Sequence, residues 1–235
     1  MTQSAFAMAT ETHPLIHFRG AVFVPLISGA LYWPAENPLL VAGLHLEKHA
    51  TFARTGQLLP PYDTSMTLRR LAADLAETGA DTLISLGDGF HRDEGTLSLM
   101  PHDRALLAEL TSRAAWIWLS GNHDPMPHRL GGRCMARLAY RELTFSHEPR
   151  PGAAGLVAGH LHPAARVTMN GRSVRRPCIV HDGALMVLPA YGASTGTLNI
   201  LSRAFVGLFD MARIEVTMLG RDRAYAVSVK RLIKG

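Results

Sequence analysis

Side chains that bind metal ions recur along the sequence directly after short apolar stretches. They are His45 after 39–42, Gly87-Asp88 after 82–86, Gly121-Asn122-His123-Asp124 after 116–119, His147 after 143–146, and His160-Leu161-His162 after 156–158. Together these positions supply two carboxylates, one amide and five imidazoles. Oxygen and nitrogen donors of this kind suit divalent manganese, iron, zinc or nickel rather than a thiolate site.

The apolar stretches must therefore be the elements that position these side chains. Strands predicted at 39–42, 82–86 and 116–119 alternate with helices predicted from Thr64 or Ser65 to Gly79 and after Pro101. Such alternation is typical of βαβ units, in which functional loops follow the carboxyl ends of parallel strands.

The remaining elements are predicted from the same hydrophobic patterns. Residues 14–33 indicate two edge strands joined near Pro25, and 46–66 indicates a loop, possibly after a short helix. The first helix is expected to bury the stripe Met66, Leu68, Leu71, Leu75 and Ala76. The second half predicts short strands at 143–146, 156–158, 165–169, 173–180, 184–188 and 197–201, then a helix at 204–209.

Composition excludes several classes of protein. The 235 residues are 47% hydrophobic and 18% charged, which excludes a disordered chain. The net charge of +5 favours anionic partners. Cys134 and Cys178 form no Cys-x-x-Cys pair, so reduced thiols are expected. The N-terminus shows no secretory signal and 21–33 is too short to span a bilayer, which predicts a soluble, cytoplasmic protein without a membrane partner.

Each motif has a simpler interpretation when taken alone. A single histidine after a strand is usually a surface residue, and Gly-Asp is usually a turn. His160 and His162 are harder to dismiss, because alternate residues of an extended segment point to the same side. The ordered combination of motifs favours a metal site.

In these motifs the sequence resembles the calcineurin-like metallophosphoesterases, whose pattern is Asp-x-His, Gly-Asp-x-x-Asp, Gly-Asn-His-Asp/Glu, a lone His and Gly-His-x-His. It is most similar to the branch of DNA-ligase-associated DNA damage response endonucleases (PdeM-type), and the similarity runs from about residue 17 to 210. The segments that carry it are HLEKH (45–49), LLPPYDT (58–64), GNHDP (121–125), LGG (130–132), SHEP (146–149), AGHLHP (158–163), GRSVRRPC (171–178) and LPAYGASTG (188–196).

The resemblance implies an α/β fold, a four-layer α/β/β/α sandwich that forms one domain over 1–235, with a core at about 14–210 and further strands in 211–235. It implies a metal-dependent phosphodiesterase, a DNA endonuclease acting in repair. Two divalent ions would clamp the phosphodiester and activate water. Manganese is the expected metal, with iron, zinc and nickel as alternatives.

The same resemblance assigns roles to individual residues. Asp88 would bridge the two ions, with His45 and His162 on the first ion and Asn122, His147 and His160 on the second. His123 would face the scissile phosphate and assist the leaving oxygen. Asp124 would orient His123.

Two positions depart from the family pattern. Gly43 stands where the family has the aspartate of Asp-x-His, so the first ion is expected to bind weakly. A natural weakening, an engineered or accidental substitution, and rescue by water, Asp93 or Glu47 all remain open. His91 replaces the second aspartate of Gly-Asp-x-x-Asp, which is close to what the branch shows.

Basic residues form two groups in the sequence: Arg166, Arg172, Arg175 and Arg176, and then Arg221, Arg223, Lys230, Arg231 and Lys234. Arg175 and Arg176 are predicted to bind substrate, although a solvated hairpin face is the more common explanation for such residues. The expected partner is single-stranded or nicked DNA, with a functional association with a DNA ligase and a helicase. The oligomeric state stays open, a homodimer included.

Two other functions remain open. The same metal site suits a small-molecule phosphoesterase acting on a nucleotide or cyclic nucleotide. A degenerate, non-catalytic binding module is the other alternative, and Gly43 is the feature that supports it.

Overall fold

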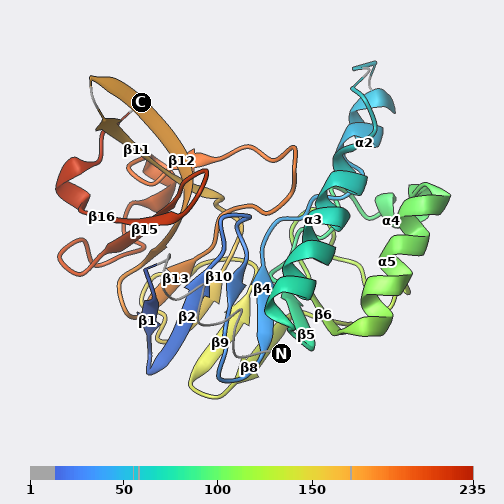
Figure 1. Cartoon of the computed structure of the whole chain (residues 1–235), viewed down its shortest axis with the longest axis horizontal. Coiled ribbons are helices and arrows are strands. Elements are labelled where there is room, and N and C mark those ends of the chain that lie inside the picture. The colour runs from blue at the N-terminus through green and yellow to red at the C-terminus, as the bar shows by residue number, and fades with distance from the viewer. Residues whose placement is uncertain (1–13, 55, 58, 170, 235) are drawn as a thin grey trace.

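Two β-sheets lie face to face, with the α-helices on the outer side of the first sheet (Figure 1). The computed structural model describes residues 14–234 except 55, 58 and 170, so the prediction about a signal at the N-terminus lies outside the described residues. The predicted mixed α/β fold with two large sheets is confirmed.

The first sheet is formed by the N-terminal half of the chain. Its strand order is β1 (Ile16–Phe18), β2 (Ala21–Pro25), β3 (Leu31–Tyr32), β4 (Pro38–Val41), β5 (Thr82–Ser85), β6 (Ala115–Leu119) and β7 (Arg133–Met135). Strands β1 to β4 are antiparallel, whereas β4, β5, β6 and β7 are parallel. The carboxyl ends of β4, β5 and β6 therefore meet at one edge.

The second sheet is formed by the C-terminal half. Its order is β14 (Leu198–Asn199), β11 (Pro163–Met169), β12 (Arg172–His181), β13 (Leu185–Val187), β10 (Leu156–Ala158), β9 (Leu143–Ser146) and β8 (Arg137–Tyr140). Strand β15 (Glu215–Leu219) pairs with β12, and β16 (Ala224–Val227) pairs with β15. Strands β9, β10 and β13 are parallel, so β9 and β10 also end at a common edge.

Three apolar layers hold these elements together. Phe23 and Leu40 of the first sheet pack against Phe145 and Met186 of the second. The outer face of the first sheet is covered by α3 (Asp63–Thr78) and α5 (Pro101–Arg113), with the shorter α2 (Lys48–Arg54) and α4 (Gly95–Ser98) beside them (Figure 1).

The outer face of the second sheet was expected to be covered by a layer of α-helices, but its cover is different. Phe205 and Phe209 pack on it, but within the described residues only a 3₁₀ turn, η1 (Arg203–Phe205), forms there. The helix predicted over 204–209 is thus replaced by a single turn. The turn ends at Val206, whose backbone is extended with a ψ of 126°, and Gly207 follows with a φ of 78°, which no right-handed helix permits. A second 3₁₀ turn, η2 (Val229–Arg231), lies near the C-terminus.

The buried face of α3 also differs from the predicted one. Gly79 ends the helix with a φ of 66°, as the sequence predicts, but the helix begins at Asp63, before the predicted cap at Thr64 or Ser65. Leu68 and Leu71 are buried, but Met66 and Ala76 of the predicted stripe are exposed. Polar side chains take their place: Thr64, Thr67 and Asp74 are buried and bond to Glu47, Ala193 and Tyr191, respectively.

Two further expectations concern the whole chain. Cys134 and Cys178 are both free thiols. Among the described residues, every helix is too short or too polar to cross a bilayer.

Candidate metal centre

The edge where the carboxyl ends of β4, β5, β6, β9 and β10 meet holds the residues predicted to bind metal. His45, Asp88 and Asn122 follow β4, β5 and β6, whereas His147 and His160 follow β9 and β10. Backbone contacts join the segments here: Ala42 bridges Ala190, and the Tyr191 amide donates to the Ala42 carbonyl at 2.7 Å. The site therefore lies along the seam between the two sheets.

One group of donors comprises His45, Asp88 and His162. A ligand atom from each lies within 4.8 Å of the others. His45 Nε2 is 3.3 Å from His162 Nε2 and 3.6 Å from Asp88 Oδ2. The structure thus brings together the residues predicted to hold the first ion.

A second group comprises Asp88, His147 and His160. His147 Nε2 is 3.4 Å from the same Asp88 Oδ2. The amide oxygen Oδ1 of Asn122 lies 2.9 Å from both His147 Nε2 and His160 Nδ1. This is the set predicted for the second ion, and Asp88 belongs to both groups.

The spacing of these atoms fits ions bound between them. Ligands about 2.1 Å from one ion lie about 3.0–3.4 Å apart for right-angled to tetrahedral geometry. The pairs above are separated by 2.9–3.6 Å. His147 Nδ1 also lies 3.0 Å from the Leu86 carbonyl, the second contact that commonly orients a metal-binding imidazole.

Backbone strain is concentrated at the same residues. His45, Asp88, His160 and His162 have φ values of 44°, 51°, 66° and 45°, in the left-handed region that is costly for residues other than glycine. Such strain persists only where the surroundings enforce it, and it clusters at functional sites.

Burial also lowers the pKa of the imidazoles, which keeps them in the neutral form that binds metal ions. Burial, together with the neighbouring His162 and His123, lowers the pKa of His45 to about 2. Burial lowers the pKa of His162 to about 4, even though Asp88 acts in the opposite direction. Both rings are therefore unprotonated at neutral pH, the state that binds metal.

The space beside the Cα of Gly43, where the family's aspartate side chain would lie, is not empty. Its φ is 55°, and a Cβ added there would lie 2.7 Å from His162 Nε2. The ring of His162 thus occupies the space into which a side chain would extend. The Gly192 amide bonds to the Gly43 carbonyl at 3.0 Å and fixes this segment.

The proposed substitutes for the missing carboxylate are engaged elsewhere. Asp93 Oδ1 accepts a hydrogen bond from the Met126 amide at 3.1 Å. Glu47 accepts bonds from Thr64 at 2.9 Å and from Ser98 at 3.4 Å. Neither carboxylate belongs to a donor group of the described residues, so rescue by these two residues is not supported.

His123 lies beside the first group, but its orientation has a different cause from the one predicted. Its Nδ1 lies 3.1 Å from the His91 carbonyl, so Nδ1–H donates to that carbonyl and Nε2 is the nitrogen left for another partner. Asp124 instead accepts backbone hydrogen bonds from Phe90 at 2.9 Å and Gly121 at 3.2 Å. Asp124 therefore connects the loops that follow β5 and β6 and does not orient His123 directly.

Burial raises the pKa of Asp124 to about 7. The neighbouring Asp88 adds to the effect, and the backbone hydrogen bonds to Asp124 oppose it.

Sequence reasoning gave His91 no role in the site. His91, His45 and His123 form a third group of donor atoms within 4.8 Å of one another. The signal was present in the sequence, because His91 stands where the family pattern has a carboxylate.

Arg175 and Arg176 lie outside these groups, on the long β11–β12 hairpin. Arg175 donates to the Thr197 carbonyl, in the segment that leads from Gly192 to β14. Arg176 lies opposite Ala165, on the other face of the hairpin.

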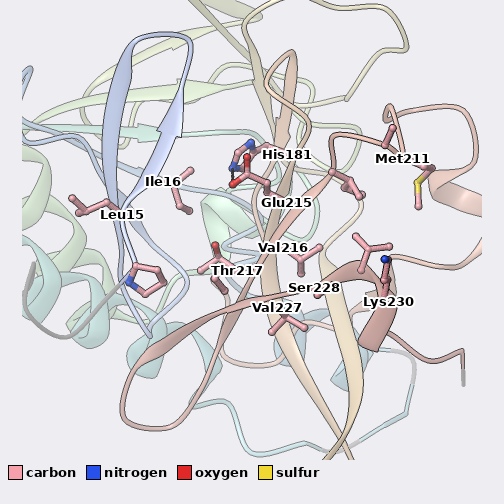
Figure 2. Close-up of a pocket in the computed structure, with 15 residues that line it drawn as sticks. Leu15, Ile16, His181, Met211, Glu215, Val216, Thr217, Val227, Ser228 and Lys230 are labelled. Carbon is pink, nitrogen blue, oxygen red and sulfur yellow. Dashed lines mark ion pairs between the residues drawn. The ribbon is translucent and has the colours of Figure 1, made fainter.

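A groove of about 580 Å³ lies away from the donor groups, between β1 and the C-terminal strands β15 and β16 (Figure 2). In it, His181 Nε2 lies 3.9 Å from Glu215 Oε2. The predicted site residues do not line this groove.

Comparisons with known proteins bear on the fold and on the class of reaction. The crystal structure of Pseudomonas putida nuclease MPE matches with a TM-score of 0.70 and 28% sequence identity, covering 92% of this chain and 100% of that chain. The similarity confirms the predicted metallophosphoesterase-type fold and supports a hydrolase acting on phosphodiester bonds. YfcE, a phosphoesterase from E. coli, matches at 14% identity over 84% of this chain and 96% of its own, with a TM-score of 0.37 that is too low to indicate a shared fold. No protein-family profile and no curated protein matches the chain.

Proposed function

We propose that the protein is a metal-dependent phosphodiesterase that cleaves DNA. The observation that carries the proposal is the pair of donor groups that share Asp88, at the seam of a fold similar to that of a nuclease. When bound, two divalent ions at these groups would neutralise the charge of a phosphodiester and activate water.

The residues of the chain then have distinct tasks. Asp88 contributes its carboxylate to both groups, and the neutral oxygen of Asn122 completes the second without adding charge. His123 donates from Nδ1 to the His91 carbonyl, so its imidazolium form would give the Nε2 proton to the leaving oxygen and become the neutral ring. Manganese is the metal we propose for the two groups, since both mix imidazole with oxygen donors.

Charge on the β11–β12 hairpin supports DNA as the substrate. Residues 163–181 contain four arginines and no acidic residue. Arg166 and Arg175 lie directly opposite each other, an arrangement of like charges that is destabilising unless an anion lies between them. Arg166 Nε is buried without a hydrogen-bond partner among the described residues. A phosphate of the DNA backbone matches this pair of guanidinium groups.

The C-terminal segment extends the same basic surface. Leu232 bridges Val167 of β11, and the Ile233 amide donates to the Arg166 carbonyl at 2.9 Å. This pairing brings Lys230, Arg231 and Lys234 close to the hairpin, although the two basic groups are far apart in the sequence.

Comparing two substrates tests the proposal. With manganese, the protein should cleave single-stranded DNA and also a nitrophenyl phosphodiester. Arg175→Ala should raise KM for DNA about tenfold and make it less sensitive to salt, because each phosphate contact releases counterions. The same change should leave hydrolysis of the nitrophenyl ester unaltered.

Arg113→Ala is the matched control, since Arg113 is an exposed arginine on α5 that pairs with Glu109. It should leave both activities unchanged. Hydrolysis of the nitrophenyl ester without any DNA cleavage would favour a small-molecule phosphoesterase. No hydrolysis of either substrate with any divalent ion would favour the binding module.

A role in DNA repair, alongside a DNA ligase and a helicase, is our proposal from the sequence resemblance. Cells that lack the protein should then be more sensitive to DNA damage, and the Asp88→Asn variant should fail to restore resistance. Restoration by that variant would contradict a catalytic role in repair.

A further inference from the structure

The third donor group, formed by His45, His91 and His123, differs in chemistry from the two groups that share Asp88. Its donor atoms are all imidazole nitrogens, which lie within 4.8 Å of one another. The ring centroids are 5.1 Å apart for His45 and His123, 5.1 Å for His91 and His123, and 5.8 Å for His45 and His91.

Backbone pairing holds these three rings in place. The segment after β4 runs beside the loop after β5, with the His45 amide bonded to the Asp88 carbonyl and the His91 amide bonded to the Leu46 carbonyl, both at 2.9 Å. The His91 carbonyl then accepts the bond from His123 Nδ1 at 3.1 Å. Through its main chain, His91 is therefore bonded to His123 and to Leu46, the residue that follows His45.

Two nitrogens of this group lack a partner. His45 Nδ1 and His91 Nδ1 are both buried and make no hydrogen bond within the described part of the chain, and His45 is only 6% exposed. A buried polar atom without a partner costs about 1–3 kcal/mol, so its retention calls for an explanation. A bound cation would engage these lone pairs.

Donor type decides which cation fits. Three imidazoles with an open fourth position are a common zinc ligand set, whereas manganese prefers oxygen donors. We propose that His45, His91 and His123 form a separate binding site for Zn²⁺, and that zinc bound there inhibits the protein.

The inhibition follows from the sharing of residues and rests on the function proposed above. His45 belongs to the first Asp88 group, and His123 is the proposed proton carrier. A zinc ion on this group would occupy His123 Nε2 and so withdraw His123 from proton transfer, whereas His45 Nε2 would still face Asp88 and His162. The binding of zinc does not depend on the proposed function.

Zinc binding is tested first, by calorimetric titration of the full chain after its metal-binding groups have been saturated with manganese. The wild-type protein should bind one equivalent of Zn²⁺ more than the His91→Gln variant. His17→Gln, which changes an exposed histidine on β1, is the control and should behave as wild type. Equal stoichiometry in His91→Gln and wild type would overturn the proposal.

A measurement on the wild-type chain covers the case in which His91→Gln does not fold. Zinc should protect His91 from modification by diethyl pyrocarbonate, read by mass spectrometry, whereas manganese alone should not. Modification of His91 at the same rate with and without zinc would also overturn the site.

Inhibition is tested on the manganese-activated hydrolysis of a nitrophenyl phosphodiester. Half-inhibition of the His91→Gln variant should require at least tenfold more zinc than half-inhibition of the wild type. Equal sensitivity of the two proteins would remove the inhibitory role. Absence of hydrolysis in the wild type would contradict the proposed function and leave the calorimetric result as the test of the site.

Discussion

Substitution of Gly43 is the sharpest test of the site geometry, because a side chain there would be destabilised both by the left-handed backbone and by the contact with His162. In the metal-free protein, Gly43→Ala places a Cβ on a backbone with a φ of 55°, and that atom lies 2.7 Å from His162 Nε2. The left-handed conformation costs about 1–2 kcal/mol for a residue with a side chain. Displacing the ring of His162 from its rotamer adds about 1 kcal/mol.

Together these penalties predict a loss of about 2–3 kcal/mol in the free energy of unfolding. For a chain of this size the melting temperature should fall by about 5–10 °C. Thermal and urea unfolding in the presence of a chelator measure both quantities.

A matched control separates the two penalties. Gly152 has a φ of 69°, but a Cβ added there would meet nothing within 4 Å. Gly152→Ala should therefore show only the cost of the left-handed backbone. If Gly43→Ala proves as stable as Gly152→Ala, His162 does not occupy the space beside Gly43.

Gly43→Asp extends the test to metal binding. It should be as unstable as Gly43→Ala in chelator, and it should regain more stability with manganese because it adds an anionic donor beside His45. The strain at this position opposes that gain, so restoring the family's aspartate does not restore a strong first site outright. Equal recovery of the two variants with manganese would mean that the added carboxylate does not reach the ion.

Three other predictions follow from the site. Asp88→Asn should abolish hydrolysis and weaken both metal sites in a calorimetric titration with manganese, since Asp88 belongs to both groups; retained binding at either site would contradict the sharing. His123→Gln should slow DNA cleavage about a hundredfold and should affect a nitrophenyl leaving group much less; equal losses would remove His123 from the proton-transfer role. In chelator, stability measured by urea unfolding should fall as the pH drops from about 6.5 towards 4, because the unfolded chain protonates histidines near 6.5 whereas His45 and His162 have folded pKa values of about 2 and 4. Asp124, with a pKa raised to about 7, acts in the opposite direction, whereas His91, whose pKa burial lowers to about 4, adds to the loss. A stability that stays level or rises over that range would contradict these burial effects.

The sequence predicts the central strands well because their burial leaves a clear pattern. Strand β9 was predicted with its observed bounds, and β4, β5 and β6 were predicted within one or two residues at each end. The donor residues could be identified because each follows such a stretch. Their convergence on one metal site was expected because functional loops follow the carboxyl ends of parallel strands, whereas their division between two ions came from the family pattern.

Predictions from the hydrophobic pattern were wrong where polar side chains are buried or where strands carry mostly exposed residues. The buried face of α3 could not be read from hydrophobic periodicity, because Thr64 and Thr67 are buried through hydrogen bonds to loops that are distant in the sequence. Strands β7 and β8 escaped notice because most of their residues are exposed or only half-buried, and each begins with an exposed arginine. The left-handed backbone at Gly43 leaves no sequence signal beyond the glycine itself.

The position of the donor groups at the seam also bears on how the chain unfolds. Asp88 extends from the first sheet, whereas His147 and His160 extend from the second. An ion held by all three acts as a cross-link between segments that are roughly 60 or more residues apart, and closing a loop of that length removes considerable entropy from the unfolded chain. Separation of the two sheets then requires release of the ion. Amide protons of β9 and β10 should consequently exchange more slowly as the metal concentration rises.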